Sequence, residues 1–260
     1  MNALAPRRRH PAAILLLLLL GLVATGGLYT LLAPKPAHAA TATADDVSAG
    51  TMLFLANCAT CHGLHAEGSK DAPSLAGVGA AAVDFQVGTG RMPLAGPGVQ
   101  AAASKKIKFT DAQIVSLAAY VASLSPGPAI PDDQYTKGDG NIAHGNELFK
   151  VNCAMCHNFA GSGGALTRGK YAPSLRNVTG THVYEAMVSG PQSMPVFNDA
   201  NLSPADKNDV ISYLHELDKN KNPGGMNLGN LGPVSEGMFI WVFGLSLVVG
   251  AAVWLGAKAA

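Results

Sequence analysis

All four cysteines of the chain lie in two copies of one pentapeptide, Cys-x-x-Cys-His. Two cysteines with this spacing, followed at once by a histidine, are the attachment signature of c-type haem. The short spacing lets both thiols add across the two vinyl groups of one porphyrin, and the adjacent imidazole then faces the iron. The sequence therefore predicts two covalently bound haem c groups. The predicted attachment and proximal residues are Cys58, Cys61 and His62 in the first copy and Cys153, Cys156 and His157 in the second.

Two other chemistries use paired cysteines, and the surrounding sequence favours neither. A zinc site would need a second pair of ligands within a short span, and no such pair stands near either pentapeptide. A thioredoxin-like redox site would need a βαβ context, which the flanking sequence does not predict.

A haem iron held by one histidine needs a second axial ligand, and two methionines are candidates. Met92 and Met194 each precede a proline, in loops that follow the two pentapeptides. Thioether sulfur is a soft ligand that suits haem iron and raises its reduction potential, while proline stiffens the loop that presents it. We expect Met92 and Met194 to complete the two iron sites. Met187 and Met155 are the alternatives in the second half of the chain.

Two prolines are candidates for orienting the histidines. A proximal histidine normally donates its free ring N–H to a carbonyl oxygen, which fixes the ring. The segments Ala72-Pro73-Ser74-Leu75 and Ala172-Pro173-Ser174-Leu175 follow the two pentapeptides. We predict that the carbonyl oxygens of Pro73 and Pro173 accept these hydrogen bonds.

The two motifs are embedded in an internal repeat. Residues 50–59 recur as residues 145–154, and the order of the later matches is kept: an Ala-Pro-Ser-Leu segment, a Met-Pro pair and a Tyr-x-x-x-Leu pattern. Two copies indicate a duplicated domain and not a solenoid. We predict a first domain over residues 41–127 and a second over residues 128–222. An N-terminal segment, residues 1–40, and a C-terminal segment, residues 223–260, flank them.

Each copy begins and ends with a helical pattern, which predicts an all-α fold. Thr110 is a favourable N-cap for the last helix of the first copy, and Ser203 followed by Pro204 is its counterpart in the second. The stretches between the helices are rich in glycine and proline and show no β-type alternation. Before each pentapeptide, residues at i, i+1 and i+4 share one helix face. These residues are Leu53, Phe54 and Asn57, then Leu148, Phe149 and Asn152.

Two long apolar runs flank the repeats. The run from Ala12 to Ala33 follows three arginines, and the run from Met238 to Ala257 has a tryptophan near each end. Each run is long enough to cross a hydrocarbon core of about 30 Å as a helix. We expect the second run to be a transmembrane helix, and the first to be either a retained span or a signal removed after Ala37-His38-Ala39. Because arginines stay on the inner side, both readings place the repeats on the outer face of the cell membrane.

The charge balance and the iron ligands exclude two classes of partner. The formal net charge is +1, and charged residues make up 13% of the chain. Nucleic-acid binding depends on a basic footprint, so we expect no nucleic-acid partner. With histidine and methionine on both irons no coordination position is open, so we also expect no small-molecule substrate on this chain.

Each half of the chain resembles a class I cytochrome c domain. The resemblance covers residues 47–217 and includes a first helix, the attachment motif, a Pro-Ser-Leu segment, a Met-Pro loop and a closing helix with a tyrosine. It implies that the first helix packs on the closing helix in each half. The residues implied are Gly50 and Phe54 near Tyr120, and Gly145 and Phe149 near Tyr213.

The C-terminal stretch has a more specific resemblance. Pro223-Gly224-Gly225, Leu228-Gly229, residues 232–237 and Trp241 run straight into the apolar segment. In this arrangement the chain resembles the dihaem cytochrome c subunit of the actinobacterial quinol:cytochrome c reductase, the cytochrome bcc complex.

That resemblance implies a function and a set of partners. The chain would be an electron-transfer subunit of an oxidoreductase, beside a cytochrome b subunit. It would take electrons from a Rieske iron–sulfur protein and pass them to a haem–copper oxidase. Two alternatives are a membrane-anchored dihaem donor to another oxidase or dehydrogenase, and a dihaem peroxidase, in which one iron must be open or weakly ligated.

Overall fold

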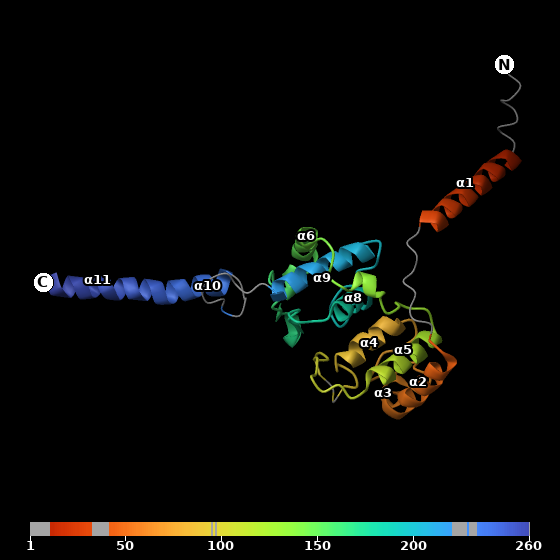
Figure 1. The fold of residues 1–260 in the computed structure, drawn as a ribbon, viewed down its shortest axis with the longest axis horizontal. Helices are drawn as coiled ribbons and strands as arrows, with labels where there is room; N and C mark the ends of the chain where they lie inside the picture. Colours follow the sequence, from red (N-terminus) through yellow and green to blue (C-terminus); the bar gives the residue numbers. More distant parts are fainter. Residues whose placement is uncertain are drawn as a thin grey trace, which may run out of the picture. The chain divides into compact units, whose positions relative to one another are not determined.

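The computed structural model describes residues 11–32, 42–94, 96, 98–219, 228 and 233–259. The chain divides into an N-terminal unit, residues 1–37, and a second unit, residues 38–260. The described part of the first unit is the helix α1 (Pro11–Leu32), and the second unit contains both repeats (Figure 1). The arginines at positions 7–9, the sequence at 37–39 and residues 223–225 lie outside the described residues.

The first repeat is helical, and two of its helices start at capping boxes. The Thr43 hydroxyl accepts a hydrogen bond from the backbone N–H of Asp46, and the Thr110 hydroxyl accepts one from Gln113, which confirms Thr110 as an N-cap. Such caps satisfy amide groups that have no partner inside the helix. The helices are α2 (Ala44–Asn57), α3 (Ala59–His62), α4 (Gly79–Gly88) and α5 (Asp111–Leu124).

The second repeat has the same helix order with a small addition. Its helical elements are η2 (Asp133–Tyr135), α6 (Ile142–Asn152), α7 (Ala154–His157), α8 (Gly180–Ser189) and α9 (Pro204–Lys219). The Ser203 hydroxyl accepts from the backbone N–H of Asp206, so the predicted cap of α9 is confirmed. The addition is a two-residue antiparallel ladder around the turn η3 (Thr167–Gly169), in which β1 (Gly164–Ala165) pairs with β2 (Tyr171–Ala172). The fold is therefore mostly, not wholly, helical.

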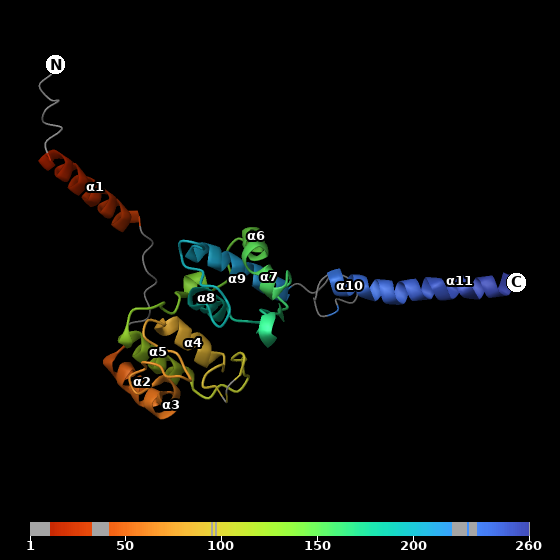
Figure 2. The same cartoon turned by 180° about the vertical axis from the view of Figure 1, so that it is seen from behind.

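In each repeat the first and last long helices cross at a glycine (Figures 1 and 2). A Cβ atom added to Gly50 would lie 1.9 Å from the carbonyl oxygen of Ser116. A Cβ atom added to Gly145 would lie at the same distance from the carbonyl oxygen of Asp209. Any side chain at these two positions would force the helices apart, because backbone already occupies the space.

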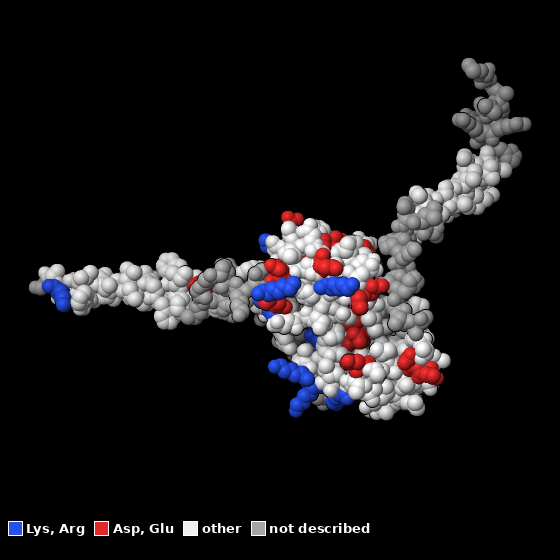
Figure 3. Space-filling model, in the orientation of Figure 1, with Lys and Arg blue, Asp and Glu red and all other residues white. Residues whose placement is uncertain are grey.

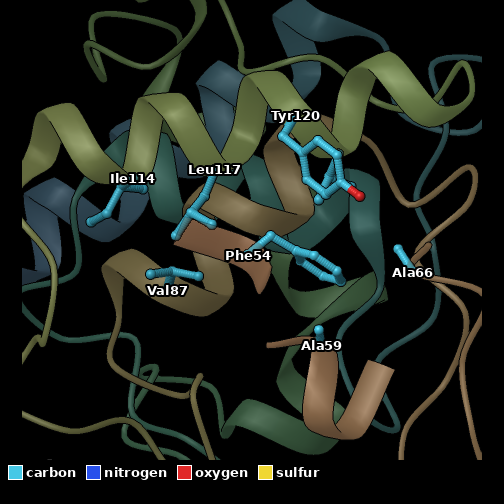
Figure 4. Close-up of a cluster of buried hydrophobic side chains, with 8 residues drawn as sticks. Phe54, Ala59, Ala66, Val87, Ile114, Leu117 and Tyr120 are labelled. Carbon is cyan, nitrogen blue, oxygen red and sulfur yellow. The ribbon is translucent and has the colours of Figure 1, made fainter. Parts of the chain in front are cut away.

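Aromatic pairs close the two cores beside these crossings. The ring centroids of Phe54 and Tyr120 are 5.0 Å apart, and those of Phe149 and Tyr213 are 5.3 Å apart. Figure 4 shows Phe54 beneath the α5 residues that include Tyr120, with Ala59 of the attachment motif on its other side. The packing of first on closing helix that the family resemblance implies is confirmed in both repeats.

The sequence patterns do not anticipate α4 and α8. Both helices occupy segments that read as glycine-rich loops: α4 begins and ends with glycine, and α8 carries several β-branched residues. Neither composition is strongly helical. Each helix packs on the closing helix of its own repeat, and the two pack on each other. Tertiary contacts therefore stabilise them more than local propensity does.

The described helices include two that are long and apolar enough to cross a membrane, judged by length and composition. They cover Ala12–Tyr29 and Val234–Ala259. The second runs through α10 (Pro233–Phe239), the π-helical η5 (Ile240–Leu245) and α11 (Ser246–Ala259). Its apolar side chains are exposed, and Figure 3 shows almost no charge along it. An exposed apolar surface of this extent is typical of a helix that contacts lipid or another protein.

Candidate haem sites

Each attachment motif sits on a short turn that continues from the preceding long helix. In the first repeat the Cys58 N–H donates to Phe54 O at 2.8 Å, and the His62 N–H donates to Cys58 O at 2.9 Å. The second repeat reproduces both distances with Cys153 and His157. Each histidine and both cysteines before it are therefore held on one rigid backbone unit. The phenylalanine one turn before each unit, Phe54 or Phe149, is buried in the core.

A proline carbonyl faces each histidine ring, as predicted. The Nδ1 atom of His62 lies 2.8 Å from Pro73 O, and the Nδ1 atom of His157 lies 2.9 Å from Pro173 O. A carbonyl oxygen can only accept, so this contact selects the tautomer with the proton on Nδ1. The Nε2 atom is then the ring nitrogen with a free lone pair, which is the arrangement of a metal-ligating histidine.

A glycine allows each proline loop to approach its histidine. The Gly68 N–H donates to His62 O at 2.7 Å, and the Gly163 N–H donates to His157 O at 2.9 Å. Both glycines have positive φ, and a Cβ atom would lie 2.5 Å from Ser74 N in the first repeat and 2.6 Å from Ala172 O in the second. The sequence analysis did not predict this pair of glycines. A glycine does stand between the attachment motif and the proline in both copies, and this recurrence could have indicated them.

The second repeat contains a cavity of about 250 Å³ at its attachment motif. Its wall is mainly apolar and includes both motif cysteines, His157 and Met194. Other contributors are Phe149, Leu166, Leu175, Val183, Leu214 and Pro195. A thiol pair, an imidazole and a thioether around one apolar cavity form a donor set that fits an iron porphyrin attached through sulfur.

In the first repeat the predicted methionine and one motif cysteine pack against one buried cluster, while Cys61 is exposed and His62 is partly exposed. Met92 and Cys58 both pack against the core that contains Phe54, Leu117 and Tyr120. The Met92 N–H donates to Gln86 O at 2.9 Å, which ties the methionine loop to the end of α4. The structure thus brings the predicted sulfur ligand and the first cysteine of the motif to one core.

The alternative methionines of the second repeat have very different surroundings. The Met155 side chain is 92% exposed. Met187 on α8 is 2% exposed and lines the same cavity as Met194. The Phe197 N–H donates to Met187 O at 2.7 Å, so α8 also holds the loop that carries Met194. Geometry therefore excludes Met155 from the cavity wall and leaves Met187 beside Met194.

Burial sets the protonation of the motif side chains. His157 is 8% exposed, and burial lowers its pKa, although the hydrogen bond to the Pro173 carbonyl acts in the opposite direction. A neutral imidazole is the form that binds a metal. Burial, with the neighbouring charge of Cys156, raises the pKa of Cys153 to about 12. Burial also raises the pKa of Cys58, so both groups are neutral thiols at physiological pH before attachment.

Residues of the first repeat help to close the second cavity. Phe85, Thr89, Arg91, Gln100 and Ala103 belong to its lining. The Gln100 side chain donates to Tyr171 O at 2.8 Å and accepts from the Tyr171 N–H at 2.9 Å. These contacts join the repeats beside the cavity. The sequence does not predict these contacts, because neither segment has a local pattern that shows it meets the other.

Two family profiles match the chain, one on each repeat. The family described as "Cytochrome c" matches residues 47–125. The family described as "Cytochrome C oxidase, cbb3-type, subunit III" matches residues 140–214. The two repeats are therefore cytochrome c domains, each with one Cys-x-x-Cys pair.

Known relatives match nearly the whole chain. The cytochrome bc1 complex cytochrome c subunit of Corynebacterium efficiens is 41% identical over 96% of this chain and 90% of its own. The subunit of the same description from Mycobacterium leprae is 43% identical over 94% of this chain and 87% of its own. That from Mycobacterium tuberculosis is 42% identical over 97% of this chain and 92% of its own. The chain therefore belongs to the family of cytochrome c subunits of the actinobacterial cytochrome bc1 complex, as its C-terminal sequence suggests.

Proposed function

We propose that this electron-transfer subunit of a quinol:cytochrome c reductase holds two covalently attached haem c groups. In the first domain Cys58 and Cys61 form the thioether bonds, and His62 and Met92 are the axial ligands. In the second domain Cys153 and Cys156 form the bonds, and the axial ligands are His157 and Met194. The observation that carries this proposal is the cavity of the second domain, whose wall includes all four of its residues.

The chain's own residues determine how a bound haem would be held. Bound haem iron supplies reversible one-electron chemistry. The Pro73 and Pro173 carbonyls fix the two histidine rings, and the apolar cavity wall excludes water from the second site. Methionine ligation favours the reduced metal, which keeps the potential high.

We further propose the route of the electrons and the place of the chain. Its first partner is a Rieske iron–sulfur subunit, its second is a haem–copper oxidase, and a cytochrome b subunit accompanies it. The helix from Val234 to Ala259 anchors the chain, with both domains on the outer face of the cell membrane. Membership of the cytochrome bc1 complex family supports this placement, because the relatives are described as subunits of that complex.

The test is a haem count on the purified complex. Denatured wild-type chain should retain two haem masses, and a chain with Cys153→Ala and Cys156→Ala should retain one. Cys58→Ala with Cys61→Ala is the matched variant for the first domain and should also leave one. A wild-type chain that releases all its haem into acidified acetone would overturn covalent attachment. Co-purification without a Rieske protein or a cytochrome b would overturn the proposed partners and leave the haem assignment standing.

A further inference from the structure

A cluster of three metal-ligating side chains lies between the two cytochrome c domains. Helices α4 and α8 pack side by side where the domains meet (Figures 1 and 2). Asp84 lies on α4, and His182 and Glu185 lie one turn apart on α8. Each residue offers one ligand atom, and these atoms all lie within 4.8 Å of one another. The two domains therefore contribute to one cluster, which shares no residue with either attachment motif, although His182 also lines the cavity of the second domain.

Glu185 is the unusual member of this cluster. Its side chain is 0% exposed, and in the ionised form neither carboxylate oxygen has a hydrogen-bond donor facing it among the residues that the structure describes. A buried carboxylate without a partner is strongly destabilising unless it takes up a proton or pairs with a cation. Burial, followed by the nearby charge of Asp84 and a side-chain hydrogen bond that the protonated carboxyl makes to it, raises the pKa of Glu185 to about 10. Glu185 therefore holds a proton when no cation is bound, and a cation at this position would replace that proton.

The other two ligands are positioned to share an ion with Glu185. The Nε2 atom of His182 lies 3.9 Å from an Asp84 carboxylate oxygen, without a hydrogen bond between them. Burial lowers the pKa of His182, with the charge of Asp84 opposing, so its imidazole is neutral and able to bind a metal. The side chains of Asp84 and His182 are about one-fifth exposed, which leaves a path from solvent to the buried carboxylate.

We propose that Asp84, His182 and Glu185 bind one divalent transition-metal ion, with Zn²⁺ as the best match, that bridges the two cytochrome c domains. One imidazole nitrogen and two carboxylate oxygens are ligands that zinc accepts, with bonds of about 2.0–2.2 Å. Donors around a tetrahedral ion of that size are roughly 3.4 Å apart. Small side-chain rotations that draw the three donors together complete the site, and a water molecule takes the fourth position.

The bound ion would have a structural consequence for electron transfer. It joins α4 to α8, and α8 also contributes Val183 and Met187 to the cavity wall of the second domain. The Met92 loop begins at the end of α4. The ion therefore fixes the elements that carry both sites with respect to each other. This inference concerns domain orientation and does not depend on which methionine binds iron.

The chain offers a matched control in a second cluster that also has one histidine and two carboxylates. His144, Asp206 and Asp209 also lie within 4.8 Å of one another. These carboxylates already have hydrogen-bond partners. The Asp209 carboxylate accepts from the Asn141 N–H and is hydrogen-bonded to the His144 ring, and the Asp206 carboxylate accepts from the Ser203 hydroxyl. A cluster with satisfied carboxylates has no need of a cation. Zinc should therefore bind the cluster of Asp84, His182 and Glu185 and not this second cluster, although the ligand types are alike.

The test measures zinc in the intact complex carrying both haems. Complexes stripped with a chelator are dialysed against Zn²⁺, freed of unbound metal, and compared by zinc content per cytochrome c chain. Glu185→Gln and His182→Gln should each hold one zinc fewer than the wild type, and His144→Gln should hold the same amount. The Glu185→Gln variant removes a buried charge at constant shape, so its fold should persist, and its haem count verifies this.

A second measurement locates the ion. Zinc should slow amide hydrogen exchange in both α4 and α8 of the wild-type complex by several-fold, and should have no effect there in Glu185→Gln. Equal zinc contents in the wild type and the two interface variants would overturn the proposal. So would an exchange effect that survives in Glu185→Gln. In those cases a proton, and not a metal, would neutralise Glu185.

Discussion

The buried ammonium group of Lys207 donates a hydrogen bond to an Asp199 carboxylate oxygen at 2.7 Å. Lys207 lies on α9 and also donates to Leu202 O at 2.6 Å, with the Tyr184 ring centroid 5.4 Å away. Asp199 belongs to the loop between α8 and α9 that carries Met194. The pair therefore ties the methionine loop of the second domain to its closing helix. In the first domain Ile114 takes the equivalent position of α5 and is buried in the apolar core.

Removing the Asp199 carboxylate should lower the stability of the second domain more than replacing Lys207 with an uncharged side chain of similar size. Asp199→Ala leaves the buried ammonium group with the Leu202 carbonyl as its hydrogen-bond acceptor, and should lower the free energy of unfolding by about 2 kcal/mol. This loss is smaller than the roughly 3–5 kcal/mol expected for a fully buried pair, because Asp199 is half exposed. Lys207→Met keeps an apolar chain of similar volume and should be nearly neutral, since hydrophobic residues often replace buried pairs without loss. Denaturant unfolding followed at the second haem measures both, and the reverse order of stabilities would contradict the assignment.

The reduction potential of the second haem should distinguish the roles of Met187 and Met194. Met194→Ala should keep the haem attached but lower its reduction potential and open the iron to an added ligand such as imidazole. Met187→Ala should instead destabilise the domain by about 3 kcal/mol, the usual result of a cavity at a buried methionine, and leave the potential near that of the wild type. A redox titration of each variant decides the matter. If the potential falls only in Met187→Ala, Met187 is the ligand.

The glycines at the helix crossings should tolerate no side chain. In Gly145→Ala the new Cβ atom would lie 1.9 Å from Asp209 O, so α6 and α9 must separate. We expect a loss of at least about 2 kcal/mol, in the range of overpacked cores. Lys150→Ala on the exposed side of α6 is the control and should change stability by less than about 0.5 kcal/mol. Equal effects of the two variants on the denaturation midpoint would show that the crossing is not as tight as described.

The stability of the second domain should depend on pH through His144. Its ring nitrogen lies 2.8 Å from an Asp209 carboxylate oxygen, and this hydrogen bond, with the charges of Asp209, Asp206 and Glu147, raises the pKa of His144 above 6.5. A raised pKa in the folded state stabilises the domain fully below about 6.5, and this stabilisation is lost as pH rises through the folded value. Unfolding midpoints measured across this range should therefore fall more in the wild type than in His144→Gln. Parallel curves would mean that His144 is not linked to stability.

Features that follow local rules can be predicted from the amino-acid sequence. The attachment motifs depend on five consecutive residues, the helix caps at Thr110 and Ser203 on the next three or four, and the apolar segments on uninterrupted composition. The internal repeat also predicted the hydrogen bond between each histidine ring and a proline carbonyl, because two in-register copies limit the candidate acceptors. The caps, the apolar helices and the histidine–proline hydrogen bonds agree with the structure, and haem attachment at the two motifs stays a prediction. A cap or an apolar helix meets its requirement within a few residues, so a local pattern is enough to predict it.

Contacts between residues far apart in the chain depend on tertiary packing. Helices α4 and α8 lack strong local signals and form because the closing helices and each other provide an apolar surface. Gln100 meets Tyr171, and Asp84 meets Glu185, only after the two domains pack together. Such contacts depend on the shape of two separately folded cores. No spacing within either segment encodes that shape, so sequence patterns could not predict them.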